Sequence, residues 1–253
     1  MHILVCIKQV PDTTEVTLSS DFTLQRDFVA QVMNPADESA LELALKLREQ
    51  QGGDVTVMSM GPVRVETTLR EALSRGVDRA VLLTDSRFAG ADTLVTAECL
   101  KTAAAYLGGF DLILCGRRAV DGETGQVGPM LAAMLDIPCV ANATNITAAD
   151  GKLAIDQLTE NGVITWKAGM PALVTMCEWS HRLRLPTIMG LRRAHEAEVE
   201  RLTPDDLGIT NCGLKASPTR VVHVSARPVG VRPCKKMPLA DVLAELEKRE
   251  VFE

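Results

Sequence analysis

The stretch that most constrains the fold of this 253-residue chain runs from Asp111 to Leu135. It begins with a short apolar run at 112–115, typical of a buried strand, and ends with an amphipathic run at 127–135, typical of a helix. The loop between them is rich in small, acidic and glycine residues, with Pro129 in the first helical turn. Such a strand–loop–helix unit often holds phosphate, because glycine allows close approach of main-chain N–H groups and the helix start attracts anions.

Strand and helix patterns alternate through the first half of the chain. Compact apolar runs predict strands at 3–7, 55–60, 80–83 and 112–115. A helical pattern follows each run, and the first is bounded by Asn34-Pro35 at its start and Gly52-Gly53 at its end. Parallel strands joined by helices require right-handed crossovers. The chain is therefore predicted to be an α/β protein with a doubly wound, mostly parallel, Rossmann-like sheet covered on both faces.

The pattern changes after Pro138. Strands at 152–159 and 163–167, joined across Asn161 and Gly162, predict a β-hairpin addition, and 172–177 predicts one more buried strand. A short hairpin is also expected within 17–32, whereas 181–193 is irregular and basic.

The last part of the chain has no sheet pattern. Prolines and glycines interrupt it before a final amphipathic helix at 239–248. We therefore expect a domain at 1–193 and a C-terminal arm at 194–253. The arm is expected to pack on this domain or on a partner subunit, with disorder as the alternative.

Composition excludes several classes of function. A net charge of −6 argues against general nucleic-acid binding. No apolar run approaches the ~20 residues that span a bilayer, and the N-terminus lacks the features of a signal peptide. The seven cysteines are scattered without a C-x-x-C pair, which indicates reduced thiols in a cytoplasmic protein. The histidines lack acids or cysteines at ligand spacing, so no metal site is expected.

The glycine-rich loop matches neither of two common phosphate motifs. No Lys-Ser or Lys-Thr follows its glycines, and their spacing is not G-x-G-x-x-G, so a plain strand-to-helix turn remains an alternative. Cys6, Asn34 and Met60 also fall just past predicted strand ends, where open parallel sheets bind ligands.

The residues around this loop do not form an obvious catalytic set. Asp121 and Glu123 are conceivable as an acid/base pair, but acids beside a phosphate cradle more often cap main-chain groups or bind ribose hydroxyls. Neither an activated serine nor an activated cysteine is evident. We expect no catalytic residues, and this favours a binding or electron-carrying role in which a cofactor does the chemistry.

Several stretches resemble the β subunit of electron-transfer flavoprotein. They are Asn34-Pro35-Ala36-Asp37-Glu38 with the residues up to 42, Met60-Gly61-Pro62, the helix end at 71–80, and the loop at 120–129. The similarity covers about 1–193 in order, and 217–222 fits more weakly.

The resemblance implies a heterodimer whose α subunit holds the redox-active FAD, while this chain holds an adenine nucleotide. The phosphates would face 124–128 and the start of the next helix. The cofactor-binding residues that the resemblance implies are Cys6, Asn34, Asp37, Met60, Asp121, Gly122, Glu123, Thr124, Gly125, Gln126, Val127, Gly128 and Pro129.

The resemblance also implies a partner-recognition loop at about 181–193. Leu185 would be its apolar anchor on an acyl-CoA dehydrogenase-type partner, with Pro186, Ile188 and Met189 beside it. Nearby arginines would steer an acidic partner surface. A core leucine at position 185 is the alternative.

The loop sequence bears on which nucleotide is held. The AMP-binding type resembles D-D-x-x-N-Q-T-G-Q, and the electron-bifurcating type, with a second FAD, resembles D-G-D-T-A-Q-V-G-P. This chain is closer to the latter and departs from it at Glu123 and Gly125. We therefore favour FAD over AMP.

Two versions of the carrier, and one alternative to it, follow from this comparison. In the bifurcating version, NADH delivers two electrons, which divide between ferredoxin or flavodoxin and the α-subunit flavin. In the simple version AMP is structural. A non-redox, nucleotide-binding regulatory module is the alternative outside the family.

Overall fold

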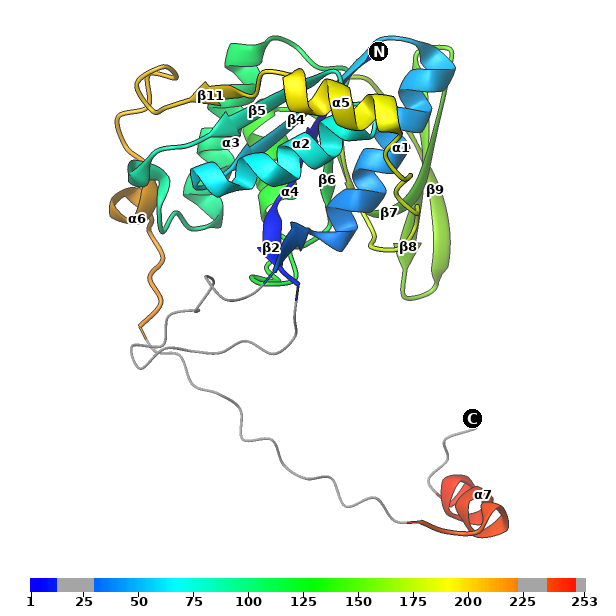
Figure 1. Ribbon diagram of the computed structural model, residues 1–253. Helices are drawn as coiled ribbons and strands as arrows, with labels where there is room; N and C mark the ends of the chain where they lie inside the picture. Colours follow the sequence, from blue (N-terminus) through cyan, green and yellow to red (C-terminus); the bar gives the residue numbers. More distant parts are fainter. Residues whose placement is uncertain (13–29, 223–235, 249–253) are drawn as a thin grey trace. The chain divides into compact units, whose positions relative to one another are not determined.

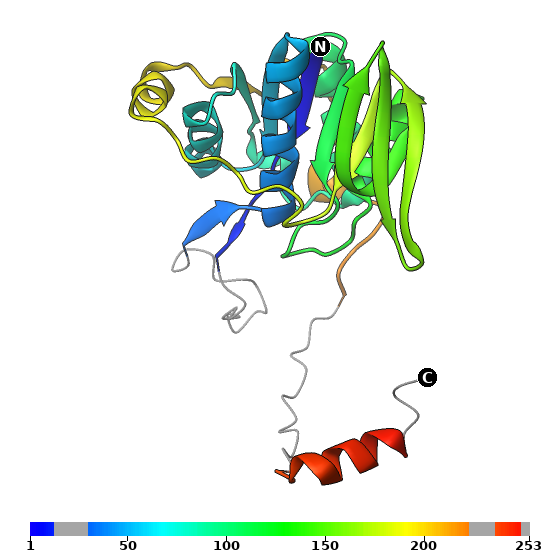
Figure 2. The ribbon, with the colours of Figure 1, turned by 90° about the vertical axis from the view of Figure 1, so that its right-hand side faces the viewer.

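A nine-stranded sheet forms the centre of the first of two units, Met1–Arg220 and Val221–Glu253 (Figure 1). The computed structural model describes residues 1–12, 30–222 and 236–248. The strand order is β11 (Glu200–Leu202), β5 (Arg79–Leu83), β4 (Asp54–Met60), β1 (His2–Cys6), β6 (Leu112–Gly116), β10 (Ala172–Met176), β7 (Cys139–Ala149), β8 (Lys152–Thr159) and β9 (Gly162–Gly169). Neighbouring strands are parallel from β11 to β7, and β7, β8 and β9, side by side in Figure 2, pair antiparallel.

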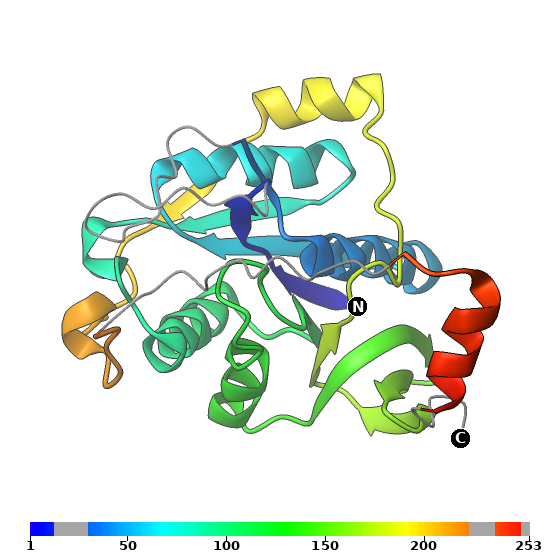
Figure 3. The ribbon, with the colours of Figure 1, turned by 90° about the horizontal axis from the view of Figure 1, so that it is seen from below.

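Helices cover both faces of this sheet, as Figure 3 shows from below. One face carries α1 (Pro35–Gln51) and α2 (Glu66–Ser74), and the other carries α3 (Thr93–Leu107) and α4 (Val127–Leu135). A further helix, α5 (Ile188–Glu196), packs on α2. The prediction of a doubly wound, mostly parallel α/β fold is confirmed.

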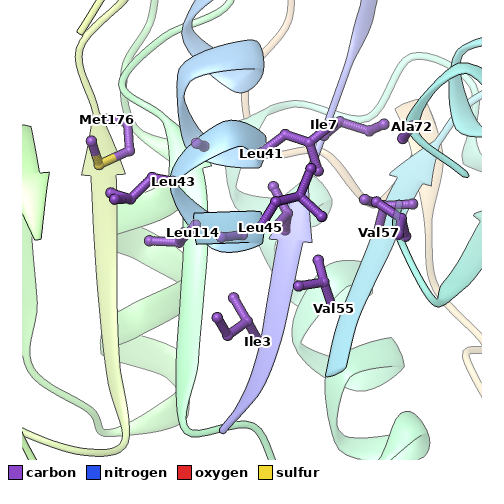
Figure 4. Close-up of a cluster of buried hydrophobic side chains, with 14 of the residues drawn as sticks. Ile3, Ile7, Leu41, Leu43, Leu45, Val55, Val57, Ala72, Leu114 and Met176 are labelled. Atoms are coloured by element: carbon purple, nitrogen blue, oxygen red, sulfur yellow. The ribbon is translucent and has the colours of Figure 1, made fainter. Parts of the chain in front are cut away.

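Two apolar clusters follow from the alternation of side chains along each strand. Ile3 and Val5 of β1 pack with α1 and α2, whereas Leu4 packs with α3 and α4. Figure 4 shows the first cluster, in which leucines of α1 lie among Ile3, Val55 and other strand side chains. The strands are buried on both faces, so they appear in the sequence as continuous apolar runs.

The remaining elements are short. They are β2 (Gln9–Pro11), which pairs antiparallel with β3 (Gln31–Met33), two 3-10 helices, η2 (Val63–Val65) and η3 (Ser86–Phe88), and the helices α6 (Gly213–Ala216) and α7 (Leu239–Glu247). Most of the hairpin expected at 17–32 lies outside the described residues. The predicted hairpin of β8 and β9 is confirmed, with Glu160 and Asn161 between the strands rather than Asn161 and Gly162.

Among the elements that were not predicted, β7, β11 and α5 have identifiable reasons. In β7, asparagines and a register shift between Ala143 and Asn145 interrupt the alternation of apolar and polar residues that would predict a strand. The three residues of β11 are too few for a pattern. In α5 only Gly190 and Ala194 are buried, so the apolar residues of this helix do not mark its core face.

The tail beyond α5 belongs partly to the first unit. β11 pairs with β5, and Thr219 donates from its N–H (3.1 Å) and its hydroxyl (2.7 Å) to the carboxylate of Asp92. The predicted domain boundary at 193–194 lies within α5, and the compact unit continues to Arg220. In the second unit α7 confirms the predicted final helix, and none of its residues is buried. No helix in the described part of the chain has the length and apolarity required to cross a membrane.

The core predicts a large cost for truncating α1. Leu45 is fully buried between α1 and the sheet. We expect Leu45→Ala to lower the free energy of unfolding by about 2–5 kcal/mol, through lost burial and the cavity left behind. Urea unfolding of the full-length protein measures this change. The matched control is Leu185→Ala at a position 82% exposed, where a change above about 0.5 kcal/mol would contradict the assignment of the core.

Candidate nucleotide-binding site

The candidate site lies at the topological switch point of the sheet. From β1 the chain continues through α1 to β4 on one side, and later returns to β6 on the other side of β1. The two loops that leave the carboxyl ends of β1 and β6 therefore diverge to opposite sides, and open α/β sheets bind ligands in the crevice so formed. The segment at 117–126, which connects β6 to α4, is called the crevice loop below.

Asn34 connects α1 to the crevice loop. It occupies the N-cap position of α1, as expected, but its side chain makes no capping hydrogen bond. Instead its amide group donates to the carbonyl of Arg118 (3.0 Å) and accepts from the N–H of Val120 (3.1 Å). Asn34 is only 1% exposed, so this pairing fixes the loop where water is absent.

Asp37, in the first turn of α1, connects the two strand ends. Its buried carboxylate accepts from the backbone N–H of Lys8 (2.7 Å) and of Gly116 (3.0 Å). Burial raises the pKa of Asp37 to about 7, although hydrogen bonds from Asn34, Lys8 and Gly116 and the charge of Lys8 act in the opposite direction. Asp37 therefore changes its charge near neutral pH.

Lys8 and Asp121 form an ion pair across the crevice. The ammonium group of Lys8 lies 2.6 and 2.8 Å from the two carboxylate oxygens of Asp121. The lysine side chain is 49% exposed, whereas that of Asp121 is 9% exposed. The pair joins the loop after β1 to the crevice loop.

The backbone of the crevice loop is strongly curved and could surround an anion; it is called the cradle below. Glu123 and Gly125 have positive φ angles of 50° and 62°. At Gly125 this conformation suits glycine and strains other residues. Gly122, Glu123 and Thr124 are exposed, so this part of the loop lies at the surface, where a ligand can reach it.

The start of α4 completes the cradle. Its N-cap residue, Gln126, makes no side-chain capping bond, and its amide oxygen accepts from the hydroxyl of Thr93 (2.9 Å) instead. The first N–H groups of a helix have no partner within the helix, so this helix start offers donors and a partial positive charge to an anion. These features fit the phosphate of a nucleotide.

Arginines flank the cradle. Arg117 forms a bidentate pair with Glu178, which lowers the pKa of that carboxyl group. Arg118 lies 3.7 Å from Glu123 and 3.8 Å from Glu178. The cations beside the loop thus have carboxylate partners within the chain.

Two further predicted residues lie at neighbouring strand ends. Cys6 ends β1 and is in register with Cys115 of β6, and a hydrogen bond with Cys6 together with burial raises the pKa of the Cys115 thiol. Met60 ends β4, the other neighbour of β1, and is half-buried. The six cysteines that the structure describes are free thiols. Within the described residues no group of His, Cys, Asp and Glu is arranged to hold a metal ion.

The predicted recognition segment presents apolar side chains to solvent. Leu185, Ile188 and Met189 are 82%, 86% and 72% exposed, so the alternative of a core leucine at 185 is wrong. Pro186 between them is half-buried.

The base of this segment is firmly held. Arg184 donates from Nε (3.0 Å) and from its backbone N–H (3.0 Å) to Glu42 of α1, and its guanidinium group also binds Glu49. Gly190 packs so closely on α2 that a Cβ atom there would lie 2.1 Å from the carbonyl oxygen of Ser74. The exposed apolar residues are therefore displayed from a fixed support.

Comparison with known proteins places the chain in a family. A family model described as electron transfer flavoprotein domain matches residues 21–207. The electron transfer flavoprotein subunit beta of Thermoanaerobacterium thermosaccharolyticum is 45% identical over 229 residues, covering 89% of this chain and 88% of that protein. The chain belongs to the electron transfer flavoprotein β-subunit family.

Two further proteins are also similar to this chain over most of their length. Protein FixA of Azorhizobium caulinodans is 42% identical over 237 residues, covering 89% of this chain and 84% of that protein. The caffeyl-CoA reductase-Etf complex subunit CarD of Acetobacterium woodii is 38% identical over 232 residues, covering 90% of this chain and 88% of that protein.

In the structure of this electron transfer flavoprotein subunit, some of the predicted site residues are linked by hydrogen bonds and others only lie at neighbouring strand ends. Asn34, Asp37 and Asp121 are linked through Lys8 and the crevice loop. Cys6 and Met60 lie at the ends of the neighbouring strands β1 and β4, and within the described residues no side-chain hydrogen bond links either of them to these three residues. Sequence reasoning missed two residues of the site. Lys8 could have been found, because a lysine directly after the strand at 3–7 indicates a cation at the carboxyl end of that strand. Glu178 could not, because no pattern in the neighbouring sequence marks it.

The buried carboxyl group of Asp37 predicts a pH dependence of stability. Its pKa is about 7 in the folded protein, against 3.8 for an aspartate side chain in water, so between these values the folded state holds a proton that the unfolded state has released. Stability from this group is therefore present at low pH and falls as pH rises towards about 7, by at most about 1.4 kcal/mol per pH unit.

Asp37→Asn should remove this contribution. We expect the wild-type free energy of unfolding, measured relative to the variant in urea, to decrease from pH 5 to pH 7.5 and then level off. A difference that stays constant across this range would contradict the raised pKa. The absolute offset reports a lost acceptor, because the N–H groups of Lys8 and Gly116 bind different oxygens of Asp37, and asparagine replaces one of these oxygens by an NH₂ group that only donates.

Proposed function

We propose that this chain is the β subunit of a heterodimeric electron transfer flavoprotein and holds an adenine nucleotide in the crevice between β1 and β6. One observation carries the proposal. The crevice loop is held at the ends of both strands through Asn34 and Asp37, while its exposed residues at 122–124 and the start of α4, which has no side-chain cap, remain available to an anion. This is the arrangement by which α/β proteins bind nucleotide phosphates.

FAD is the nucleotide that we favour over AMP. The support is the loop sequence at 121–129, which resembles the bifurcating type more closely than the AMP-binding type. When bound, FAD would accept two electrons from NADH and pass them on singly, to ferredoxin or flavodoxin and to the FAD of the α subunit. The residues of this chain would bind and orient it, with Cys6 and Met60 at the strand ends and the loop at 121–129 around the phosphates.

The electron-accepting partner that we propose is an acyl-CoA dehydrogenase-type enzyme. Leu185, Ile188 and Met189 form an exposed apolar group on a fixed base, and Arg182 and Arg192 beside them are also exposed. Apolar anchors ringed by charge are typical of protein interfaces, and rim charges mainly affect the association rate. The subunit CarD belongs, by its name, to a complex with a CoA-ester reductase, which agrees with such a partner. We place the complex in the cytoplasm.

Cofactor analysis tests the nucleotide assignment. The heterodimer is purified, denatured in acid, and its released nucleotides are separated and counted. We expect two FAD per heterodimer, because the site in this chain would hold the second one. One FAD with one AMP would replace the bifurcating version by the simple carrier. A heterodimer without flavin would overturn both.

Leu185→Ala tests the docking assignment. Removing a central apolar anchor is expected to lower the rate of electron delivery to the dehydrogenase, at limiting partner concentration, by about tenfold or more. The control is Leu158→Ala on β8, at a position 46% exposed, which should leave this rate unchanged. Nucleotide content should stay at the wild-type value in both variants. Loss of nucleotide in Leu185→Ala would show that this segment contributes to the crevice rather than to docking.

A further inference from the structure

Lys8 has a fixed main chain and a half-exposed side chain at the mouth of the crevice. Its N–H donates to Asp37 (2.7 Å), and its carbonyl accepts from the N–H of Asn34 (2.9 Å). Both contacts tie residue 8 to the start of α1. The side chain leaves this anchored point, is 49% exposed, and reaches Asp121 in the crevice loop.

The ammonium group of Lys8 has bonding capacity left. It carries three N–H donors, and the two oxygens of Asp121 engage at most two of them. Asp121 lies in the same loop as Thr124 and Gly125, so the ion pair brings a positive charge to the segment that would hold the phosphates. Asp121 therefore orients the lysine without occupying all of its donors.

The other cations beside the loop are less suited to a phosphate. Arg117 is committed to a bidentate pair with Glu178, and breaking such a pair leaves a carboxylate without its partner. Arg118 is shared between Glu123 and Glu178 at 3.7 and 3.8 Å. The loop at 117–129 contains no lysine of its own. Lys8 can meet a phosphate without giving up its existing ion pair.

We propose that Lys8 is the phosphate-binding cation of this crevice, held in position by Asp121, and that it makes the site selective for nucleotides over nucleosides. The lysine that a P-loop carries after its glycines is supplied here from the end of β1, 113 residues away from Asp121. The proposal rests on the proposed function of the crevice as an adenine-nucleotide site. A purely structural ion pair between the two loops would give no such selectivity.

The experiment compares AMP with adenosine on the intact heterodimer. The nucleotide of the crevice is first removed with chaotropic salt, and binding of each probe is measured by titration calorimetry. Lys8→Met is expected to weaken AMP binding by about 10- to 100-fold, the loss typical of one charge-assisted hydrogen bond. Adenosine binding should change by less than about threefold, since adenosine carries no charge for the lysine to meet.

Three controls separate the possible outcomes. Lys8→Arg should keep AMP affinity within about tenfold of wild type, because the positive charge remains. Lys101→Met removes an exposed lysine of α3 and should change neither affinity. If Lys8→Met does not assemble, Lys8→Gln carries the same expectation, because glutamine still donates to Asp121 without a charge.

Two results would overturn the inference in different ways. Equal weakening of AMP and adenosine in the Lys8 variants would make the Lys8–Asp121 pair structural only, with the nucleotide site retained. A wild-type heterodimer that binds neither probe would remove the proposed nucleotide site itself, and the role of Lys8 with it.

Discussion

The buried carboxylate of Asp37 is the interaction on which the crevice depends. It accepts hydrogen bonds from the backbone N–H groups of Lys8 and Gly116, which follow β1 and end β6. These strands are neighbours in the sheet, and their loops must separate at this point. A single side chain from α1 thus satisfies the main-chain donors that the divergence of the two loops leaves unpaired. The opening of the crevice therefore depends on the first turn of α1.

Burying this carboxyl group has an energetic cost, visible in its pKa of about 7. Desolvation disfavours the charged form, whereas the two N–H donors and the ammonium group of Lys8 favour it. The balance leaves Asp37 poised between two charge states, while Asn34 beside it holds the crevice loop with neutral hydrogen bonds. The loop geometry is therefore supported by two buried polar residues of different kinds, and only one of them responds to pH.

Local patterns predicted much of this architecture. The proline and acids after Asn34 defined the start of α1, and the apolar runs defined the central strands, because both signals come from residues adjacent in sequence. The hydrogen bonds of the Asn34 side chain were not predictable. Instead of capping the helix, this side chain binds Arg118 and Val120, which are 84 and 86 residues away in the sequence. The Lys8–Asp121 pair could not be predicted from the sequence either, because only the order of the parallel strands brings the two residues together. In α5 the large apolar residues Ile188, Met189 and Leu191 are exposed, so the usual rule that apolar positions mark burial fails on this helix.

Helix α1 carries the supports of both the crevice and the segment at 181–193. Asp37 in its first turn holds the strand ends of the crevice, and Glu42 and Glu49 further along bind Arg184 at the base of the segment that presents Leu185. Glu42 is 4% exposed and the side chain of Arg184 is 29% exposed, so salt screens this pair less than it screens a fully exposed one. The helix is itself packed on the sheet through a continuous row of leucines and alanines. Because a closely packed helix behaves as a rigid element, the crevice loop and Leu185 are both supported by the same body. In the proposed function, this common support would keep the bound cofactor and the partner-binding surface at a constant separation.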